Sequence, residues 1–419
     1  MTPETVYGPF GKTKALLYYG IPVLEGLRLL EAESVQTVVT SPPYWGLRDY
    51  QTSDIVWGGD KGGDKECDHE WGETLPHGRR GNRGVSGTGG NLHPTLDHSG
   101  VGAGSGGGGQ YCQKCGGWRG QLGLEPTPDM YVEHMVEVFQ EIWRVLRPDG
   151  TVWLNLGDCF AQANMDGSDI GLKQKDLVGI PWMTAFALRS AGWYLRGDIV
   201  WAKGNAMPES VRDRPTRSHE FVFLLTKNPR YFCDMAAVRE PVATPGKGSG
   251  CVERKVASVG EWSRVNNHIG FSVPWQDDGT GRNRRSVWNI NVRPYKGAHF
   301  AVMPPALAEI CVKAGTSAYG ACAECGTPWQ REHRSAEWQA GCSCDTQERR
   351  PCVVLDPFSG SATTGTVAMK YNQDYVGVDL NPEYAALAKA RLVGAQAPED
   401  EESSMDGDAL DLFGGSDGA

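Results

Sequence analysis

Short apolar strands alternate with helices along most of this chain, and this alternation constrains the fold more than any other feature. Six segments have the length and apolar composition of buried strands. They are residues 35–40, 151–156, 195–201, 221–225, 353–356 and 375–379. Helical segments are expected at 130–146, 181–191, 304–314, 363–371 and 382–392. Alternating strands and helices predict an α/β fold, with one parallel or mixed sheet covered by helices on both faces.

The distribution of glycine divides the chain. Of its 55 glycines, 22 lie between residues 58 and 123, a density at which a segment does not hold regular structure by itself. We therefore predict insertions within a common core. The expected core segments are 1–57, 124–229 and 351–396, the insertions are 58–123, 230–297 and 319–350, a helical segment covers 298–318, and the tail is 397–419.

The charge of the chain is concentrated at one end. The formal net charge is −10, but eight acidic residues and no Lys or Arg lie between 397 and 419, so the rest of the chain carries only −2. An acidic protein of this kind is compatible with a nucleic-acid partner. No run reaches the roughly 18 apolar residues that a membrane span needs, and the first residues lack a signal pattern. We expect a soluble intracellular protein with no membrane partner.

A ligand site is predicted near the C-terminus. Residues 356–365, Asp-Pro-Phe-Ser-Gly-Ser-Ala-Thr-Thr-Gly, follow a predicted strand and open a predicted helix, where open α/β sheets bind ligands. Gly360 would let the backbone approach a ligand closely. About twenty residues further on, Asp379 ends the next strand, where it is placed to accept both hydroxyls of a ribose. A structural turn would also fit the glycine alone.

A second candidate site follows the strand 35–40. In Thr40-Ser-Pro-Pro-Tyr44, the prolines fix the backbone and lack N–H groups, so carbonyls and the Ser41 hydroxyl remain as acceptors. These groups suit an exocyclic –NH₂, and Tyr44 offers a ring on which a planar base can stack. Pro-Pro-Tyr by itself is also typical of a structural turn.

Together these motifs resemble the amino-group DNA methyltransferases that use S-adenosylmethionine (AdoMet). Residues 40–44 are similar to the catalytic motif, 356–362 to the cofactor motif, and Asp379 to the acidic ribose ligand. Residues 144–150, 155–158, 201–203 and 219–225 also resemble family segments. Because the catalytic motif comes first, the order resembles the permuted β class. The resemblance implies a Rossmann-like methyltransferase fold and a bacterial or phage-encoded protein of the cytoplasm.

The resemblance implies a role for each motif residue. The catalytic residues it implies are Ser41, Pro42, Pro43 and Tyr44, which accept hydrogen bonds from the amine and stack on a flipped base. The AdoMet contacts it implies are Asp356, Pro357, Phe358, Ser359, Gly360, Asp379, His299 and Phe300. Ala362 replaces a family glycine, and we expect its methyl group to crowd AdoMet and weaken binding.

The sequence constrains the target base and the class of methyl acceptor less than it constrains the fold. Ser41 favours N4 of cytosine, because the cytosine enzymes tend to have Ser at this position and the adenine-N6 enzymes tend to have Asp. Both amines present the same donors, so adenine N6 is the alternative. An RNA or protein methyltransferase, and a zinc-bearing DNA-binding protein with impaired activity, are more distant alternatives.

Two groups of residues have the spacing of structural zinc sites. The first pattern is Cys322-x-x-Cys325 with Cys342-x-Cys344, close to a zinc ribbon. The second comprises Cys67, His69, Cys112 and Cys115, with His77, His93 and His98 as competing ligands. We predict one or two zinc ions that serve structure or DNA contact and take no part in the chemistry.

Basic segments are candidates for binding double-stranded DNA. Residues 230–296 contain eleven Lys and Arg against six Asp and Glu, and lie where the β class has its target-recognition region. The candidate DNA contacts are Arg282, Arg284 and Arg285 here, and Arg212, Arg214 and Arg217 in an earlier loop. A solvated face fits each of them equally. In the tail, which we expect to be disordered, residues 410–413 (Leu-Asp-Leu-Phe) resemble a peptide that docks on the bacterial sliding clamp, although a plain solvated tail is favoured.

Overall fold

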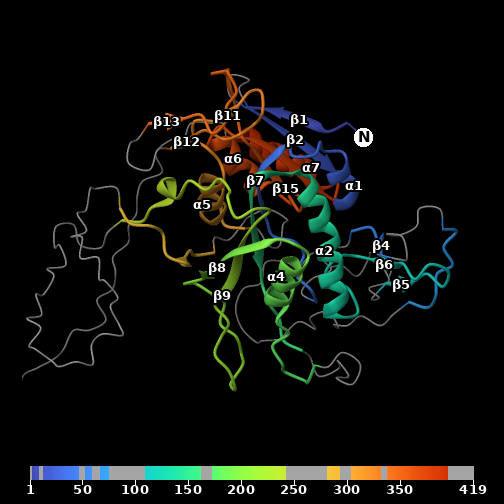
Figure 1. Ribbon diagram of the computed structural model, residues 1–419. Coiled ribbons are helices and arrows are strands. Elements are labelled where there is room, and N and C mark those ends of the chain that lie inside the picture. The colour runs from blue at the N-terminus through green and yellow to red at the C-terminus, as the bar shows by residue number, and fades with distance from the viewer. Residues whose placement is uncertain are drawn as a thin grey trace, which may run out of the picture.

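The computed structural model describes residues 2–8, 13–46, 52–58, 67–74, 109–161, 172–241, 281–292, 303–331 and 337–394. At its centre is a nine-stranded sheet with the order β1-β2-β16-β15-β3-β7-β9-β8-β10 (Figure 1). The strands are β1 (Glu4–Tyr7), β2 (Lys14–Tyr19), β3 (Val35–Thr40), β7 (Leu146–Leu156), β8 (Tyr194–Ala202), β9 (His219–Thr226), β10 (Val287–Asn289), β15 (Val353–Asp356) and β16 (Asp374–Asp379). Neighbours from β2 to β7 are parallel, whereas β1 and β9 run antiparallel to the strands beside them. The predicted mixed sheet is confirmed.

Helices cover both faces of this sheet. One apolar cluster joins the sheet to α1 (Val23–Arg28), α2 (Pro128–Val145) and α4 (Ile180–Ser190). A second cluster joins the other face to α5 (Pro305–Gly315), α6 (Thr363–Lys370) and α7 (Tyr384–Gly394). A short 3-10 helix, η2 (Met235–Val238), packs beside α5. No helix in the described ranges is long and apolar enough to cross a membrane.

Helix α2 illustrates how local sequence defines an element. The Thr127 hydroxyl caps its first turn by accepting a hydrogen bond from the Met130 backbone N–H at 3.2 Å, and Pro128 occupies the first turn, where no N–H is needed. Apolar residues at helical spacing, including Tyr131 and Met135, are buried against the sheet. The chain turns directly into β7 at Leu146, so β7 begins five residues earlier than predicted.

Within the described residues, four short strand pairings lie outside the main sheet. Strands β4 (Ile55–Trp57), β6 (Trp118–Gly120) and β5 (Gln110–Tyr111) form a three-stranded sheet against α2. Its first strand precedes residue 58, where the sequence suggests the insertion begins. In the later insertion, β11 (Ala321–Cys322) pairs with β14 (Arg349–Arg350), and β12 (Gln330–Arg331) pairs with β13 (Trp338–Gln339).

The connections of the sheet create a topological switch point between β3 and β15. From β3 the chain passes through α2 on one face to reach β7, and from β15 it passes through α6 on the other face to reach β16. Because the two connections diverge, the carboxyl ends of β3 and β15 open a crevice between them. Thr40 and Asp356 end these two strands, so both predicted motifs begin at this crevice.

Candidate active site

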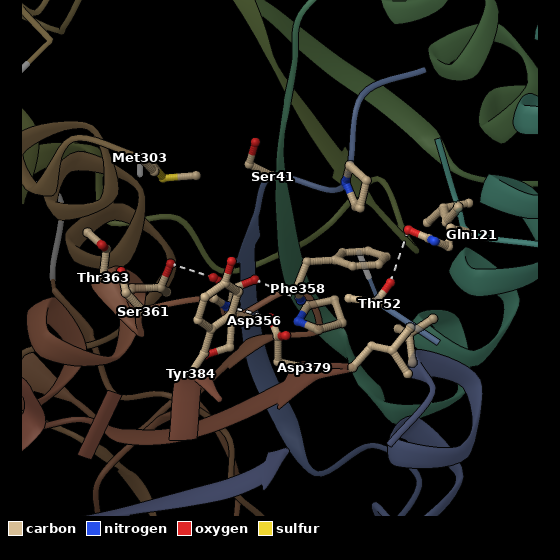
Figure 2. A pocket seen from close by; sticks show the side chains of 18 of the residues that line it. Ser41, Thr52, Gln121, Met303, Asp356, Phe358, Ser361, Thr363, Asp379 and Tyr384 are labelled. Carbon is tan, nitrogen blue, oxygen red and sulfur yellow. Dashed lines mark hydrogen bonds between the residues drawn. The ribbon is translucent and has the colours of Figure 1, made fainter. Parts of the chain in front are cut away.

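A cavity lies over the carboxyl ends of β3, β15 and β16, with an empty volume of about 1020 Å³ that includes space open to solvent. Ser41 faces it from the catalytic motif, and Asp379 and Tyr384 face it from the opposite side (Figure 2). The loop after β15 supplies residues 356–361 of the lining. Ile55, Trp57, Gln121 and Leu122 of the small sheet and its following loop form another wall. The cavity therefore brings the two predicted motifs together.

Asp356 organises the loop between β15 and α6. Its Oδ1 accepts hydrogen bonds from the Thr40 hydroxyl at 2.7 Å and the Phe358 backbone N–H at 3.1 Å, and its Oδ2 accepts one from the Thr364 hydroxyl at 2.9 Å. Burial raises the pKa of Asp356 to about 6. The carboxyl group thus ties together the ends of β3 and β15 and the start of α6.

Asp379 presents a second carboxyl group at the end of β16. Its Oδ2 accepts a hydrogen bond from the Gly360 N–H at 2.7 Å, and its Oδ1 accepts one from the Asn381 N–H at 2.8 Å. Burial raises the pKa of Asp379 to about 6, although these backbone donors oppose the shift. Each carboxylate oxygen retains acceptor capacity, because it can accept two hydrogen bonds. Asp379 can therefore bind hydroxyl groups in the cavity.

Three hydroxyl groups behind the loop hold its backbone in place. The Tyr19 hydroxyl donates to the Gly360 carbonyl at 2.9 Å and lies 2.7 Å from Ser359 Oγ, which lies 2.7 Å from the Tyr375 hydroxyl. These contacts fit a single direction of donation, in which Tyr375 donates to Ser359, Ser359 donates to Tyr19, and Tyr19 donates to the Gly360 carbonyl. Sequence reasoning missed both tyrosines, because an aromatic residue in a buried strand usually only fills space.

Ala362 adopts a left-handed backbone conformation at the N-terminus of α6, with φ 58° and ψ 41°. A left-handed backbone conformation favours glycine, which explains the glycine at this position in the family motif that residues 356–362 resemble. Ala362 is fully buried in the apolar cluster under α5, α6 and α7, and the cavity is lined by its neighbours Ser361 and Thr363. The structure does not support the crowding predicted from sequence, because the methyl group packs into the core and not against the cavity.

The catalytic motif is held from behind by α2 and the loop before it. The Tyr131 hydroxyl donates a hydrogen bond to the Pro43 carbonyl at 2.9 Å, and the Trp45 indole N–H donates to the Glu125 carbonyl at 2.9 Å. The buried Glu125 carboxyl group contacts His134 Nδ1 at 3.0 Å, and burial raises the pKa of Glu125. Ser41 and Pro43 line the cavity.

Ser41 leads into a polar cluster on β7, β8 and β9. Its hydroxyl donates to the Tyr44 hydroxyl at 3.1 Å, and the Tyr44 hydroxyl donates to Glu220 Oε2 at 2.8 Å, with Asn155 Oδ1 at 3.0 Å. Lys203 forms an ion pair with the other oxygen of Glu220. Sequence reasoning missed the role of Glu220, although residues 219–225 resembled a family segment.

Both cysteine groups are brought together by the fold. The ligand atoms of Cys67, His69, Cys112 and Cys115 all lie within 4.8 Å of one another, as do those of Cys322, Cys325, Cys342 and Cys344. The sulfur atoms of Cys67 and Cys112 are 3.9 Å apart. Tetrahedral zinc with Zn–S bonds of about 2.3 Å separates two thiolates by about 3.8 Å.

The two Cys-x-x-Cys turns share one backbone pattern. In the first, the Gly116 N–H donates to the Cys112 carbonyl at 2.9 Å, and the Cys112 N–H donates to the Gly117 carbonyl at 2.7 Å. In the second, Gly326, Cys322 and Thr327 make the equivalent bonds, each at 2.9 Å. Gly116 and Gly326 have φ values of 71° and 72°, a conformation that favours glycine. The chain therefore builds the same turn in two insertions.

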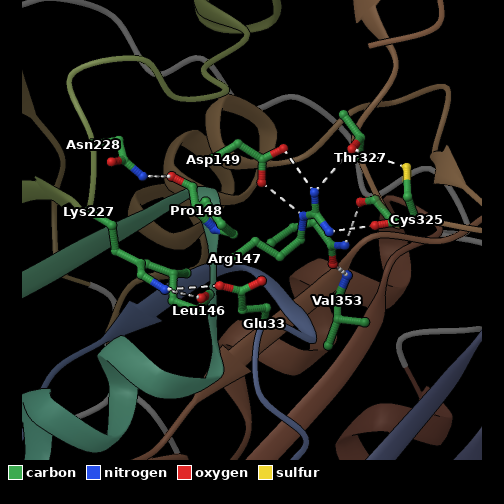
Figure 3. A network of polar contacts seen from close by, with 12 residues as sticks. Glu33, Leu146, Arg147, Pro148, Asp149, Lys227, Asn228, Cys325, Thr327 and Val353 are labelled. Atoms are coloured by element: carbon green, nitrogen blue, oxygen red, sulfur yellow. Dashed lines mark hydrogen bonds and ion pairs between the residues drawn. The ribbon is translucent and has the colours of Figure 1, made fainter. Parts of the chain in front are cut away.

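The second cysteine group is anchored to the amino ends of the parallel strands. Arg147 at the start of β7 donates to the Cys325 carbonyl at 2.6 Å and to the Thr327 hydroxyl at 3.1 Å (Figure 3). Gln36 of β3 donates to the Gly326 carbonyl at 2.9 Å and accepts from the Val353 N–H at 2.6 Å. This group lies at the strand ends opposite to those that form the cavity.

The candidate DNA-contacting arginines differ in their surroundings. Arg282 and Arg285 both form ion pairs with Glu240, and Arg284 donates to the Val238 carbonyl at 2.9 Å. In the loop between β8 and β9, Arg214 pairs with Glu209 and Arg217 with Asp158, while Arg212 is exposed. His299, Phe300 and residues 410–413 lie outside the described residues.

Sequence comparisons identify close relatives of this chain. The family model for N6/N4 methyltransferases, described as DNA methylase, matches residues 35–390. The Type II methyltransferase M.XycI of Xanthomonas campestris pv. cyanopsidis is 35% identical over 405 residues, which cover 91% of each chain. The Type II methyltransferase M.SmaI of Serratia marcescens is 33% identical over 386 residues, 88% of each chain. Among solved structures, the cytosine-N4-specific PvuII DNA methyltransferase has a TM-score of 0.47 at 15% identity, covering 93% of this chain and 88% of its own.

A mixed sheet with a ligand cavity at its switch point defines an α/β protein with a Rossmann-like fold. The family match extends this assignment from the fold to the reaction. The chain belongs to the N6/N4 DNA methylase family, and its relatives M.XycI and M.SmaI are Type II methyltransferases. The resemblance stated from sequence is confirmed.

Proposed function

We propose that this protein methylates the exocyclic amine of a base flipped out of duplex DNA, and that the amine is N4 of cytosine. The observation that carries the proposal is that Ser41 and Asp379 face the same cavity from opposite sides. The Ser41 side of the cavity offers acceptors for an amine, and the Asp379 side offers an acceptor for ribose hydroxyl groups. The cytosine assignment rests on Ser41 in the first catalytic position, with adenine N6 as the alternative.

The cavity residues fit AdoMet. Asp379 is a carboxylate with remaining acceptor capacity, and Phe358 and Tyr384 provide aromatic surface beside it. Asp356 already accepts three hydrogen bonds, so we assign it to shaping the loop that includes Pro357, Ser359 and Gly360. His299 and Phe300 remain proposed contacts. When bound, AdoMet supplies a methyl group activated by a positively charged sulfur.

Ser41 and a proline carbonyl would orient the amine. The Ser41 hydroxyl donates to Tyr44, so its oxygen lone pairs are available to accept an N–H of the substrate. The Pro43 carbonyl already accepts from Tyr131, so we assign the second acceptor to Pro42. Two accepted hydrogen bonds would turn the nitrogen lone pair toward the methyl group, so catalysis follows from positioning. Tyr44 would stack on the base.

We infer that both cysteine groups hold zinc, and their geometry supports this inference. Four soft or borderline ligands gather in each group, and both contain the same glycine-stabilised turn. Each set is complete with four protein ligands, so we assign both ions a structural role. Metal analysis of natively purified protein should find about two zinc ions per chain; protein without zinc would remove both sites.

We further propose that the DNA contacts come from Arg212, Arg214 and Arg217 and from Arg282, Arg284 and Arg285. The loop 203–218 supports this, because it begins with Lys203 and leads into β9, where Glu220 lies beside the catalytic motif. Action on DNA in the cytoplasm of a bacterial cell is consistent with the bacterial relatives. Docking of residues 410–413 on a sliding clamp remains a prediction, testable by a pull-down with and without Leu412 and Phe413.

A Ser41→Ala variant tests the proposed site. It should lower the single-turnover rate of methyl transfer to DNA by about 100-fold while leaving AdoMet affinity within about twofold, because Ser41 contacts the acceptor and not the cofactor. Ser34→Ala, at a half-buried serine before β3 that does not line the cavity, provides the matched control. Unchanged transfer by the Ser41 variant would contradict the proposal.

A further inference from the structure

A line of hydroxyl groups runs from the cavity to a carboxylate that the mechanism above does not use. Ser41 lines the cavity and donates to the Tyr44 hydroxyl at 3.1 Å. The Tyr44 hydroxyl in turn lies 2.8 Å from Glu220 Oε2. Tyr44 is also 3.0 Å from Asn155 Oδ1, but its single proton favours the charged and closer acceptor. Both donors therefore point away from the substrate and toward Glu220.

Glu220 is fixed in place by its neighbours. Lys203 pairs with Oε1, and the Asn155 side-chain N–H donates to Oε2 at 3.1 Å. The Lys203 ammonium also lies over the Trp201 ring, 4.4 Å from its centroid. The side chains of Glu220 and Lys203 are 16% and 21% exposed, so the cluster reaches solvent at one edge. The Glu220 carboxylate is thus held in a fixed position and lies near enough to solvent to release a proton to it.

Amine methylation has to dispose of a proton. The reaction forms a nitrogen–carbon bond and breaks a carbon–sulfur bond, whose electron pair stays on sulfur. The amine nitrogen then carries a positive charge until one of its N–H bonds breaks. A general base that acts through bridging hydroxyl groups can take this proton as the charge develops. In this site, Ser41 is the hydroxyl that faces the amine.

We propose that Glu220 is the terminal acceptor of the proton released in methyl transfer, reached through Ser41 and Tyr44. This inference rests on the proposed function. The amine proton passes to Ser41 Oγ, the Ser41 proton passes to Tyr44 Oη, and the Tyr44 proton passes to Glu220 Oε2. Both hydroxyl groups end neutral, and Glu220 gains one proton. Loss of the ion pair with Lys203 then favours return of that proton to solvent. Glu220 is a relay residue, since it acts through Tyr44.

The test compares Glu220→Gln with the wild-type protein in single-turnover methyl transfer. The amide can still accept the Tyr44 hydrogen bond but cannot take up the proton, so the rate should fall by about tenfold or more, with the affinities for AdoMet and DNA within about twofold. Glu220→Asp retains a carboxylate and should recover part of the rate. The matched control is Glu4→Gln, an exposed carboxylate on β1 that pairs with Lys389, with no change expected.

A solvent isotope effect separates the relay from a structural role. Transfer by the wild type should slow in D₂O with a curved proton inventory, because several protons move together, whereas Glu220→Gln and Tyr44→Phe should lose this curvature. A Glu220→Gln rate within about threefold of wild type, or the same curved inventory in the variant, would overturn the relay. Either result leaves the proposed function standing if the wild type methylates DNA, whereas absence of methyl transfer by folded wild type would overturn the proposed function itself.

Discussion

At the scale of single residues, the cofactor end of the cavity is governed by two buried carboxyl groups. Burial raises the pKa of Asp356 and of Asp379 to about 6. A raised carboxyl pKa contributes stability to the fold at low pH, and this contribution is lost as the pH rises through about 6. Binding has the opposite dependence, because only an ionised Asp379 is a full acceptor for two hydroxyl groups.

We therefore expect AdoMet affinity to rise with pH, with a midpoint near the pKa of about 6 for Asp379. Calorimetry between about pH 5 and pH 7 measures this dependence directly. In Asp379→Asn the affinity should be lower throughout and its pH dependence weaker, because the ionising acceptor is absent. Affinity that does not change over this range in the wild type would contradict the assignment.

Ala362 makes a second residue-scale prediction. Replacement by Gly relieves a left-handed backbone strain of about 1–2 kcal/mol and removes a buried methyl group worth about 0.8 kcal/mol, so stability should change by about 1 kcal/mol or less. AdoMet affinity should stay within about threefold, because the methyl group lies in the core. Binding that tightens about tenfold in Ala362→Gly would instead show that the methyl group crowds the ligand.

At the scale of elements, the two cysteine groups share a turn but serve different parts of the fold. The first supports the small sheet β4-β6-β5, and Ile55, Trp57, Gln121 and Leu122 from this region form a wall of the cavity. The second is anchored by Arg147 and Gln36 at the opposite ends of the parallel strands. Metal loss should therefore have different consequences at the two groups.

Cys112→Ser should weaken AdoMet binding by about fivefold or more, because the cavity wall loosens, whereas Cys322→Ser should lower Tm with affinity within about twofold. Zinc content, thermal unfolding and AdoMet calorimetry on the two variants provide the comparison, each serving as the control for the other. Equal effects on affinity would contradict the separation of roles.

The sequence predicted the six central strands because they are short, largely apolar runs, and the five helices because apolar residues recur along them at helical spacing. It did not reveal β1, β2 or α1, which are only four to six residues long. The cavity itself depends on strand order, which places Thr40 beside Asp356 although 316 positions separate them. The cysteine groups were predictable from spacing, whereas Tyr19, Asn155 and Glu220 were not, since their roles arise from contacts across the sheet.

At the scale of the whole molecule, the positive charge that a segment presents depends on the carboxylates that pair with its arginines. The count of basic residues in 230–296 predicted a DNA surface, but Arg282 and Arg285 share the carboxylate of Glu240. Trp288, one of the tryptophans of this region, belongs to β10 of the main sheet and is buried in an apolar cluster. Arg212 in the loop between β8 and β9 is exposed. The net charge counted along residues 230–296 is therefore larger than the positive charge that Arg282 and Arg285 present to DNA.

We expect the DNA affinity of a variant with Arg212, Arg214 and Arg217 replaced by Ala to depend less steeply on salt. The slope of log affinity against log salt concentration should decrease in magnitude by about 0.9 for each phosphate contact that is lost. Replacement of Arg282 and Arg285 should reduce it less, because this variant removes two positive charges and the first removes three. DNA-binding titrations at several salt concentrations test both. An unchanged slope in the first variant would remove that loop from the interface.

The most direct test of the account is the identity of the modified nucleoside. Labelled AdoMet is incubated with the protein and unmethylated genomic DNA, and the digested nucleosides are analysed by mass spectrometry. The account predicts N4-methylcytosine, produced by wild type and strongly reduced in Ser41→Ala. N6-methyladenine would keep the fold and the site but contradict the choice of base, and DNA without label from folded, AdoMet-binding protein would contradict the proposed function.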